Sequence, residues 1–326
     1  MTASSDNKQG MLIHGGAMGD LVLSLRVAAA LNTLTPRITL VARNELAHQF
    51  VGIAGIDHVI DIESSGFHVL FSDTLQPSDL PKNLNPTHDP IINMLTGGRV
   101  RENLRFIGIK NIIDLDPSPR DDDVRHVTEQ WLGDLAKHGV NTAPPMPMLE
   151  ISKADLRNAS KALRHASRDE SRPIGIIHPG SGGRRKCWPH MLEFAERIHA
   201  EYAAVICMLG PVEAEIMPDA EKAEWAKRFP IQWSPVNGLV PLLAAADFFV
   251  GNDSGVSHLA AITGTHTLTV FGPTDPRVWS PIGPRAAVVA PKSGKAWPTV
   301  DHVMQSFVAL GGEGLDPLGS IDIVNP

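Results

Sequence analysis

The sequence has very few cysteines, since only Cys187 and Cys207 occur among 326 residues. They form no CxxC pair, so neither a zinc motif nor a dithiol redox motif is present. Two isolated cysteines are typical of small, buried or half-buried residues in a reducing compartment.

Long apolar runs are also missing. The first ten residues, MTASSDNKQG, are polar and lack the apolar core of a signal peptide. The longest apolar candidate, residues 239–250, is interrupted by Pro241 and Asp247. No run reaches the length of about 18 residues that a membrane-spanning helix needs. We therefore expect a cytoplasmic protein.

An excess of positive charge is absent as well. The chain has 29 Lys and Arg residues against 36 Asp and Glu residues, a formal net charge of -7. Binding to nucleic acid along a broad surface needs a basic face, so this function class is excluded. A local basic pocket for a phosphate remains compatible with this balance.

Two familiar nucleotide-binding fingerprints are missing from the first glycine-rich turn. Residues 15–19 read GGAMG, which does not match GxGxxG. No Gly-Lys-Ser/Thr follows, so a P-loop is excluded too. A nicotinamide-dependent dehydrogenase is therefore not expected.

The pattern that is present alternates short apolar runs, glycine-rich turns and amphipathic stretches. This alternation is typical of β-α units and predicts an α/β fold with parallel sheets. The length suits two domains of roughly 150 residues each. Because NTAPPMP at residues 141–147 has the composition of a linker, we expect domains at 1–150 and 151–326. A last helix or tail that packs back on the first domain is left open.

The first half predicts a strand at 11–14, a helix at 20–32 and a strand at 37–42. Residues 57–62 and 68–71 are weaker strand candidates. The stretch 73–90 is rich in Pro, Asn and Asp, which predicts a long loop. A helix is expected over residues 124–138.

The second half repeats the alternation. We expect strands at 173–178, 203–209, 248–250 and 267–271. We expect helices at 153–167, 189–200, 213–228 with a break at Pro218, 239–246 and 252–264.

The first candidate site residue is Asp20, which follows the glycine-rich turn at the start of the first helix. Such a turn leaves free amides at the helix N-terminus. One interpretation is that Asp20 caps the helix. The other is that its carboxylate is a general base that accepts a proton from an attacking hydroxyl. Both interpretations can hold together.

The second candidate is the loop HPGSGGRRKCWP, residues 178–189. Its glycines allow close approach of a ligand, and Ser181 offers a hydroxyl. Arg184, Arg185 and Lys186 concentrate positive charge in an acidic protein. The loop is either a solvated basic segment or a cradle for a diphosphate, with Lys186 stabilising the leaving group.

The third candidate is GNDSGVSHLAAITGT, residues 251–265, where a strand runs into a helix. Amides of Ser254 and Gly255 can bind phosphate oxygens with help from the helix dipole. Simple capping by Asp253 and Ser254, and a packing role for His258, remain alternatives. Open α/β sheets bind ligands at this end of their strands.

Weaker candidates lie in three further segments. Thr274, in a turn-rich loop at 271–281, can contact phosphate or belong to ordered turns. Glu213 can accept hydrogen bonds from ribose hydroxyls. Residues 114–116 read Asp-Leu-Asp, the DxD form of metal-dependent sugar transferases, but the following Pro117 favours a turn. The acidic run 121–123 is expected to be a solvated face.

Four segments together resemble glycosyltransferase family 9, the heptosyltransferase family of lipopolysaccharide core synthesis. They are GAMGDLVLSLRVAAAL, IHPGSGGRRKCWP, VGNDSGVSHLAAITGTHTLTVFGPTDP and HVTEQWLGDLAKHGV. The resemblance covers roughly the first 40 residues and most of 124–290. It is poor between residues 64 and 123. It implies two facing Rossmann-like domains (the glycosyltransferase B fold), inversion at the anomeric carbon and no DxD-bound metal.

The resemblance also implies roles for individual residues. Asp20 corresponds to the general base, with Gly19 beside it as a substrate-binding residue. The implied donor is ADP-L-glycero-D-manno-heptose, with no separate cofactor, and the implied acceptor is a lipopolysaccharide-type glycan. The resemblance implies that the donor contacts are Ser181, Lys186, Glu213, Asp253, Ser254, Gly255 and His258. Thr274, a candidate from the sequence pattern, is added to this set.

Other interpretations stay open at this point. A transferase of the same fold that uses a different sugar, or a sugar-nucleotide epimerase, would share these segments. A non-catalytic sensor or assembly subunit that binds a nucleotide sugar would retain the fold and lose the acceptor site. Peripheral association with the inner face of the cytoplasmic membrane is open too.

Overall fold

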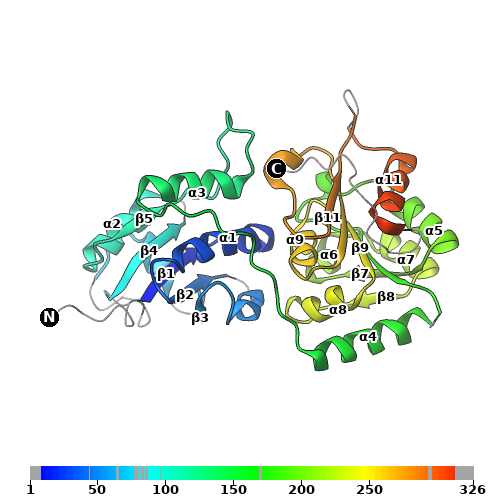
Figure 1. Ribbon diagram of the computed structural model, residues 1–326, viewed down its shortest axis with the longest axis horizontal. Coiled ribbons are helices and arrows are strands. Elements are labelled where there is room, and N and C mark those ends of the chain that lie inside the picture. Colours follow the sequence, from blue (N-terminus) through cyan, green and yellow to red (C-terminus); the bar gives the residue numbers. More distant parts are fainter. Residues whose placement is uncertain are drawn as a thin grey trace. The chain divides into compact units, whose positions relative to one another are not determined.

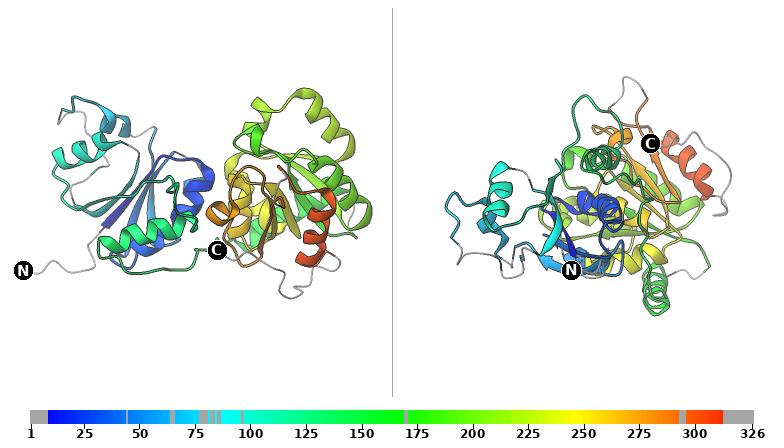
Figure 2. Two further views of the ribbon diagram at one scale, coloured as in Figure 1. Left: turned by 90° about the horizontal axis from the view of Figure 1, so that it is seen from above. Right: turned by 60° about the vertical axis from the view of Figure 1, so that its left-hand side comes forward.

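The computed structural model describes residues 9–43, 45–63, 66–76, 81, 84, 87–95, 97–168, 171–292 and 296–312. The chain divides into two compact units, Met1–Pro147 and Met148–Pro326, each of which is described by itself. Each unit is a parallel sheet covered by helices (Figure 1), and the turned views show these layers from other sides (Figure 2). The sequence leaves open that the last helix packs back on the first domain, but this helix, Val300–Phe307, packs in the core of the second unit. The tail after Gly312 lies outside the described residues.

The first unit has a five-stranded sheet of order β3-β2-β1-β4-β5. All four pairs of neighbouring strands are parallel. The chain reverses its direction of winding between β1 and β4, so the carboxyl ends of these two strands form a switch point. The strands are β1 (Gln9–His14), β2 (Arg37–Ala42), β3 (Ile56–Asp61), β4 (His88–Met94) and β5 (Ile112–Asp114). The helices are α1 (Met18–Leu31), α2 (Gly98–Phe106) and α3 (Val127–Lys137).

Two expectations for the first unit are wrong. Residues Phe67–Phe71 form a 3-10 helix rather than a strand, with Phe67 and Leu70 buried. Strand β4 begins inside the stretch expected to be a long loop, although residues 77–80, 82–83 and 85–86 of that stretch lie outside the described part. Asp89 and Pro90 resemble turn residues locally, but β4 is paired with β1 and β5 on its two sides. Tertiary pairing therefore overrides the local signal.

The second unit has a six-stranded parallel sheet of order β11-β10-β9-β6-β7-β8. This is the strand order of a dinucleotide-binding fold, with its switch point between β6 and β9. The strands are β6 (Ile174–His178), β7 (Ala204–Leu209), β8 (Ile231–Trp233), β9 (Phe248–Asn252), β10 (His266–Val270) and β11 (Ala286–Val289). The helices are α4 (Lys153–Ser167), α5 (Met191–Glu201), α6 (Pro211–Ile216), α7 (Asp219–Arg228), α8 (Leu239–Ala245), α9 (Gly255–Ile262), α10 (Pro276–Trp279) and α11 (Val300–Phe307).

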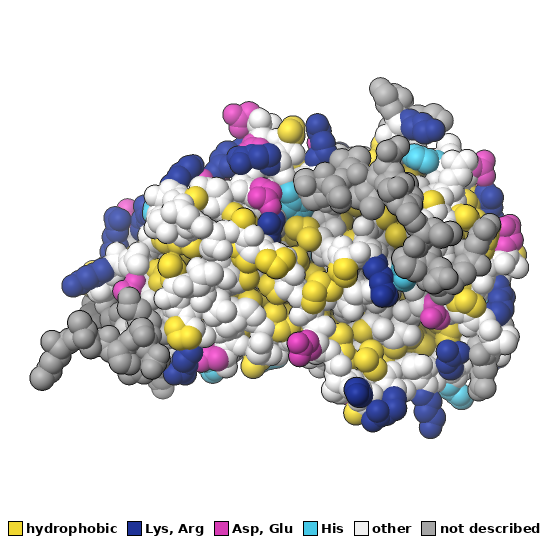
Figure 3. Space-filling view, viewed as in Figure 1, with side chains coloured by type: hydrophobic (Ala, Val, Ile, Leu, Met, Phe, Trp, Pro, Cys, Tyr) yellow, Lys and Arg dark blue, Asp and Glu magenta, His cyan; other side chains and the backbone are white. Residues whose placement is uncertain are grey.

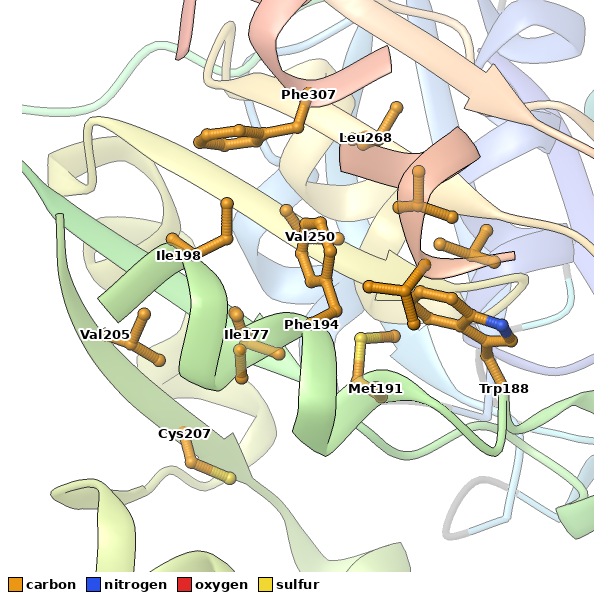
Figure 4. Packing of buried hydrophobic residues seen from close by; sticks show 14 of the residues in the cluster. Ile177, Trp188, Met191, Phe194, Ile198, Val205, Cys207, Val250, Leu268 and Phe307 are labelled. Carbon is orange, nitrogen blue, oxygen red and sulfur yellow. The ribbon is translucent and has the colours of Figure 1, made fainter. Parts of the chain in front are cut away.

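The core of the second unit contains a cluster of aromatic rings between the sheet, α5 and α11 (Figure 4). Trp188 and Phe307 flank Phe194, with ring centroids 5.8 Å and 6.1 Å from that of Phe194. Phe307 also meets Phe248 edge-on at 4.9 Å. These contacts hold the start of α5, and with it the end of the loop 179–188, against the sheet.

Both cysteines behave as expected from the sequence. Cys207 is a buried residue of β7 and Cys187 is half-buried, and neither forms a disulfide. Burial raises the pKa of both thiols, so neither is an activated nucleophile.

The surface carries charges of both signs. Lys and Arg side chains lie beside Asp and Glu side chains over the face shown in Figure 3. Among the described residues, no helix combines the length and the hydropathy that crossing a membrane would require.

Candidate active site

The switch point of the second sheet gathers most of the candidate residues. Strand β6 ends at His178 and continues into the loop 179–188, while β9 ends at Asn252 and continues into α9. Because these strands are parallel neighbours, both segments leave the same edge of the sheet. Ligands of open α/β sheets bind in the crevice at this point.

Asp253 is the centre of a polar cluster at this edge. Its side chain is buried, and Oδ2 accepts hydrogen bonds from Nζ of Lys186 and Oγ1 of Thr274, both at 2.7 Å. Its main-chain oxygen accepts a bond from Oγ of Ser181 at 2.8 Å. The structure thus brings together Ser181, Lys186, Asp253 and Thr274. The side chain of Lys186 remains 40% exposed, which leaves the ammonium able to face an anion.

Asn252 is a positioning residue that the sequence reasoning did not single out. Its buried side-chain amide donates to the carbonyls of Pro179 and Gly180 at 2.9 and 3.1 Å. Its Oδ1 accepts the amide N–H of Trp188 at 2.8 Å. One side chain therefore holds both ends of the basic loop. The available signal was an amide residue at a strand end, which can donate and accept at once.

The start of α9 offers an anion-binding terminus. Ser254 is the N-cap, but its side chain makes no capping bond, and its Oγ lies 3.3 Å from Oγ of Ser257. Gly255 is the first helical residue, and His258 is buried in the first turn. The first amides of a helix have no intrahelical acceptor, so they can bind phosphate oxygens.

Glu213 lies beside the same loop, at the carboxyl end of β7. It is buried, its Oε2 accepts the amide N–H of Gly210 at 2.9 Å, and its Oε1 lies 3.7 Å from Nε2 of His178. Nδ1 of His178 is 3.1 Å from the carbonyl of Met208, which assigns the proton to Nδ1. A Cβ on Gly180 would lie 1.9 Å from Oε1 of Glu213, so only glycine fits there.

Asp20 lies in the first unit, and its interpretation as a helix cap is wrong. Helix α1 begins at Met18, its N-cap is Ala17, and both Gly19 and Asp20 belong to the first turn. The helix therefore starts two residues earlier than the expected start at residue 20. A carboxylate in the first turn is favoured by the helix dipole.

His14, the last residue of β1, is a second residue that the sequence reasoning missed. Its side chain is 1% exposed, and its Nδ1 accepts the amide N–H of Gly16 at 3.3 Å. Burial lowers its pKa from 6.5 to about 4, so the ring is neutral at pH 7. Within the described part of the chain, Nε2 has no hydrogen-bond partner. A polar residue that ends an apolar strand was the available signal.

A cavity of about 340 Å³ adjoins this turn at the carboxyl edge of the first sheet. Its walls are largely apolar, and they include one ion pair, between Arg43 and Glu63 at 3.1 Å. The half-exposed ring of Phe71 borders it. Its lining residues are Gly15, Gly16, Arg43, Ile62, Glu63, His68, Phe71, Met94, Leu95 and Pro117.

Asp114, Asp116 and Asp123 of the first unit are engaged in other contacts. Asp114 forms an ion pair with Arg101 and accepts a bond from Nδ2 of Asn93 at 2.8 Å. Asp116 accepts the amide N–H of Ser118 at 2.9 Å. In the acidic run 121–123, hydrogen bonds from Arg125 lower the pKa of Asp123 to about 2. Among the described residues, no group of three or more His, Cys, Asp or Glu side chains is arranged to hold a metal ion.

Comparison with known proteins decides the family. Residues 122–305, more than half of the 326-residue chain, match the family described as glycosyltransferase family 9 (heptosyltransferase). The chain belongs to glycosyltransferase family 9. The resemblance found in the sequence is thereby confirmed.

Relatives within glycosyltransferase family 9 match part of the chain in sequence and most of it in fold. Lipopolysaccharide heptosyltransferase 3 of Escherichia coli is 26% identical over 162 residues, which are 48% of this chain and 47% of that protein. The chain therefore matches about half the length of this curated relative. A family 9 structure from Veillonella parvula DSM 2008 has a TM-score of 0.70 at 16% identity and covers 94% of this chain and 98% of its own. The structure of E. coli ADP-heptose lps heptosyltransferase II has a TM-score of 0.67 at 18% identity, covering 92% and 98%.

At these identities the solved structures show the fold alone. They agree with the two parallel sheets described above, so the expected α/β fold with two Rossmann-like halves, the glycosyltransferase B fold, is confirmed.

Proposed function

We propose that this family 9 member transfers a heptose from ADP-heptose to a hydroxyl of a lipopolysaccharide-type acceptor. The observation that carries the proposal is the cluster of Lys186, Asp253 and Thr274 beside the N-terminus of α9. A cation and a helix terminus at one sheet edge suit a diphosphate. The E. coli proteins named above, a lipopolysaccharide heptosyltransferase and an ADP-heptose enzyme, support this choice of substrates.

The donor diphosphate binds between Lys186 and the first amides of α9 in this proposal. Asp253 orients the ammonium, since Oδ2 accepts from Nζ at 2.7 Å. Ser254, Gly255 and His258 border the phosphates, and Ser181 and Thr274 fix the loops around them. Glu213 accepts hydrogen bonds from the ribose hydroxyls.

The reaction is a single displacement that inverts the anomeric carbon and needs no metal. The acceptor oxygen forms a bond to C1 of the heptose while the bond from C1 to the phosphate oxygen breaks. Asp20 takes the proton of the acceptor hydroxyl, and the bonding electron pair leaves with ADP. The charge that develops on ADP is stabilised by Lys186 and the helix dipole.

The acceptor binds in the cavity beside Gly15 and Gly16 in this proposal. The apolar walls and the ring of Phe71 suit the apolar face of a sugar, and the Arg43–Glu63 pair offers polar contacts. Such an acceptor is presented at the inner face of the cytoplasmic membrane, so the protein would associate peripherally with that face.

The test is transfer from ADP-heptose to an extract of lipopolysaccharide that lacks heptose, with the anomeric configuration of the product read by NMR. Asp20→Asn is expected to lower turnover by about 10²–10⁴-fold, because the base is lost. ADP affinity, measured by calorimetry, should stay within about twofold, since Asp20 lies in the other unit. Asp121→Asn, at an exposed acid of the same unit, is the matched control.

Near-normal turnover of Asp20→Asn would reject the role of the base. ADP binding without transfer to any acceptor extract would instead favour a non-catalytic protein that binds a nucleotide sugar.

A further inference from the structure

The imidazole of His14 is held in one protonation state. Nδ1 accepts the amide N–H of Gly16 at 3.3 Å, so in the neutral ring the proton resides on Nε2. Burial, which lowers the pKa to about 4, keeps the ring neutral at pH 7. His14 therefore presents a neutral N–H donor at the carboxyl end of the central strand β1.

This donor has no acceptor among the described residues, and Nε2 is sealed from solvent. Buried donors are almost always paired, and exceptions cluster where a group acts in function. Because Nε2 is buried, a neighbouring protein group is the acceptor that suits it.

Gly16 shows which group that is. A Cβ built on Gly16 would lie 2.8 Å from Cε1 and 3.2 Å from Nε2 of His14, and 3.1 Å from Oδ2 of Asp20. The imidazole and the carboxylate thus flank the same side of one glycine. Any larger residue at position 16 would fill the space between them.

We propose that His14 is a positioning residue for Asp20. The carboxylate turns so that one oxygen accepts Nε2–H, which leaves the other oxygen to receive the proton of the acceptor hydroxyl. This inference rests on the proposed role of Asp20 as the base. His14 takes up no proton itself, because Nδ1 is occupied by the Gly16 amide.

A hydrogen bond from Nε2–H favours the ionised form of the carboxylate, which is the form that accepts a proton. Among the described residues, Arg43, Glu63 and His68 are the titratable groups that line the adjoining cavity. The Arg26–Glu129 ion pair joins α1 to α3. All of these groups stay unchanged in the variants below.

Two variants separate positioning from packing. His14→Asn keeps an oxygen that accepts the Gly16 amide but lacks a donor at the place of Nε2. His14→Gln places an N–H near that position. We expect His14→Asn to lower kcat about 10–100-fold and to move the acid limb of the kcat/KM profile up by about one pH unit, with KM for ADP-heptose unchanged. His14→Gln should retain kcat within about fivefold and a near-normal acid limb.

Equal losses in both variants, or an acid limb that stays in place, would overturn the positioning role while leaving the proposed function intact. A second measurement needs no turnover. In protein with ¹⁵N-labelled histidine, the ring signals of His14 are identified by their loss in His14→Asn. In the wild-type protein these signals should show a protonated Nε2. They should shift in Asp20→Asn but not in Asp121→Asn. A protonated Nδ1, or no response to Asp20→Asn, would overturn the proposal even if the wild-type protein transferred no sugar.

Discussion

Nζ of Lys186 lies 2.7 Å from Oδ2 of Asp253, although 67 residues separate them in the chain. The contact joins the loop after β6 to the segment after β9, across the switch point of the second sheet. The two side chains differ in solvent exposure, since that of Lys186 is 40% exposed and that of Asp253 only 7%. The aspartate is therefore the fixed member of the pair, and the lysine is the member that can also contact a ligand.

Lys186→Ala should weaken ADP binding about tenfold, because one charge-assisted contact to the diphosphate is lost. Calorimetric titration with ADP measures the change. The control is Arg184→Ala, which removes another cation from the same loop. The side chain of Arg184 pairs with Glu221 and is 54% exposed. Equal effects of the two substitutions would mean that only the net charge of the loop matters.

Gly180→Ala should reduce ADP affinity and thermal stability together. The added Cβ would lie 1.9 Å from Oε1 of Glu213, so the buried glutamate or the loop must move. We expect a loss of about 1–3 kcal/mol in the free energy of unfolding. Gly182→Ala is the matched control, because nothing lies within 4 Å of its Cβ position. A Gly180→Ala protein as stable as the Gly182→Ala protein would contradict the tight contact.

Asn252→Asp should be strongly destabilising. The substitution removes the donor to the carbonyls of Pro179 and Gly180 and sets a carboxylate against them in a fully buried position. A buried, unpaired charge predicts a loss of about 3 kcal/mol or more, measured by urea unfolding. Asn237→Asp, at an exposed position, should leave the midpoint unchanged.

Acidification should destabilise the first unit through His14. The folded pKa is about 4 against 6.5 in the unfolded chain, so between these values the unfolded state binds the proton and the folded state does not. Stability is therefore full above about pH 6.5 and falls toward pH 4, by roughly 3 kcal/mol in all. Unfolding midpoints measured across this range should fall less steeply in His14→Asn. His58→Asn, at an exposed histidine, should keep the wild-type slope.

Several elements could be predicted from local signals in the chain. Helix α4 covers residues 153–167 as expected, because Ser152 caps it and its side chain accepts the amide N–H of Asp155. The break at Pro218 separates α6 from α7. Strands β5, β8 and β11 were missed, since each is short and lies at an edge of its sheet.

The kinds of group in the candidate site follow from the chain alone. A lysine in a glycine-rich loop, an Asn-Asp-Ser-Gly segment at a strand end and an acid near a helix start are local features. These groups can be predicted from short stretches of sequence, because the ends of strands and the starts of helices are set by residues that are neighbours in the chain.

The partners of those groups depend on the folded sheets. That Thr274 and Lys186 share one oxygen of Asp253, and that Asn252 holds the basic loop, follows from strand order, which joins residues far apart in the chain. The state of His14 likewise depends on burial beneath Gly16 and its neighbours. Hydrogen-bond partners and desolvation are properties of packing, and no short stretch of sequence contains them.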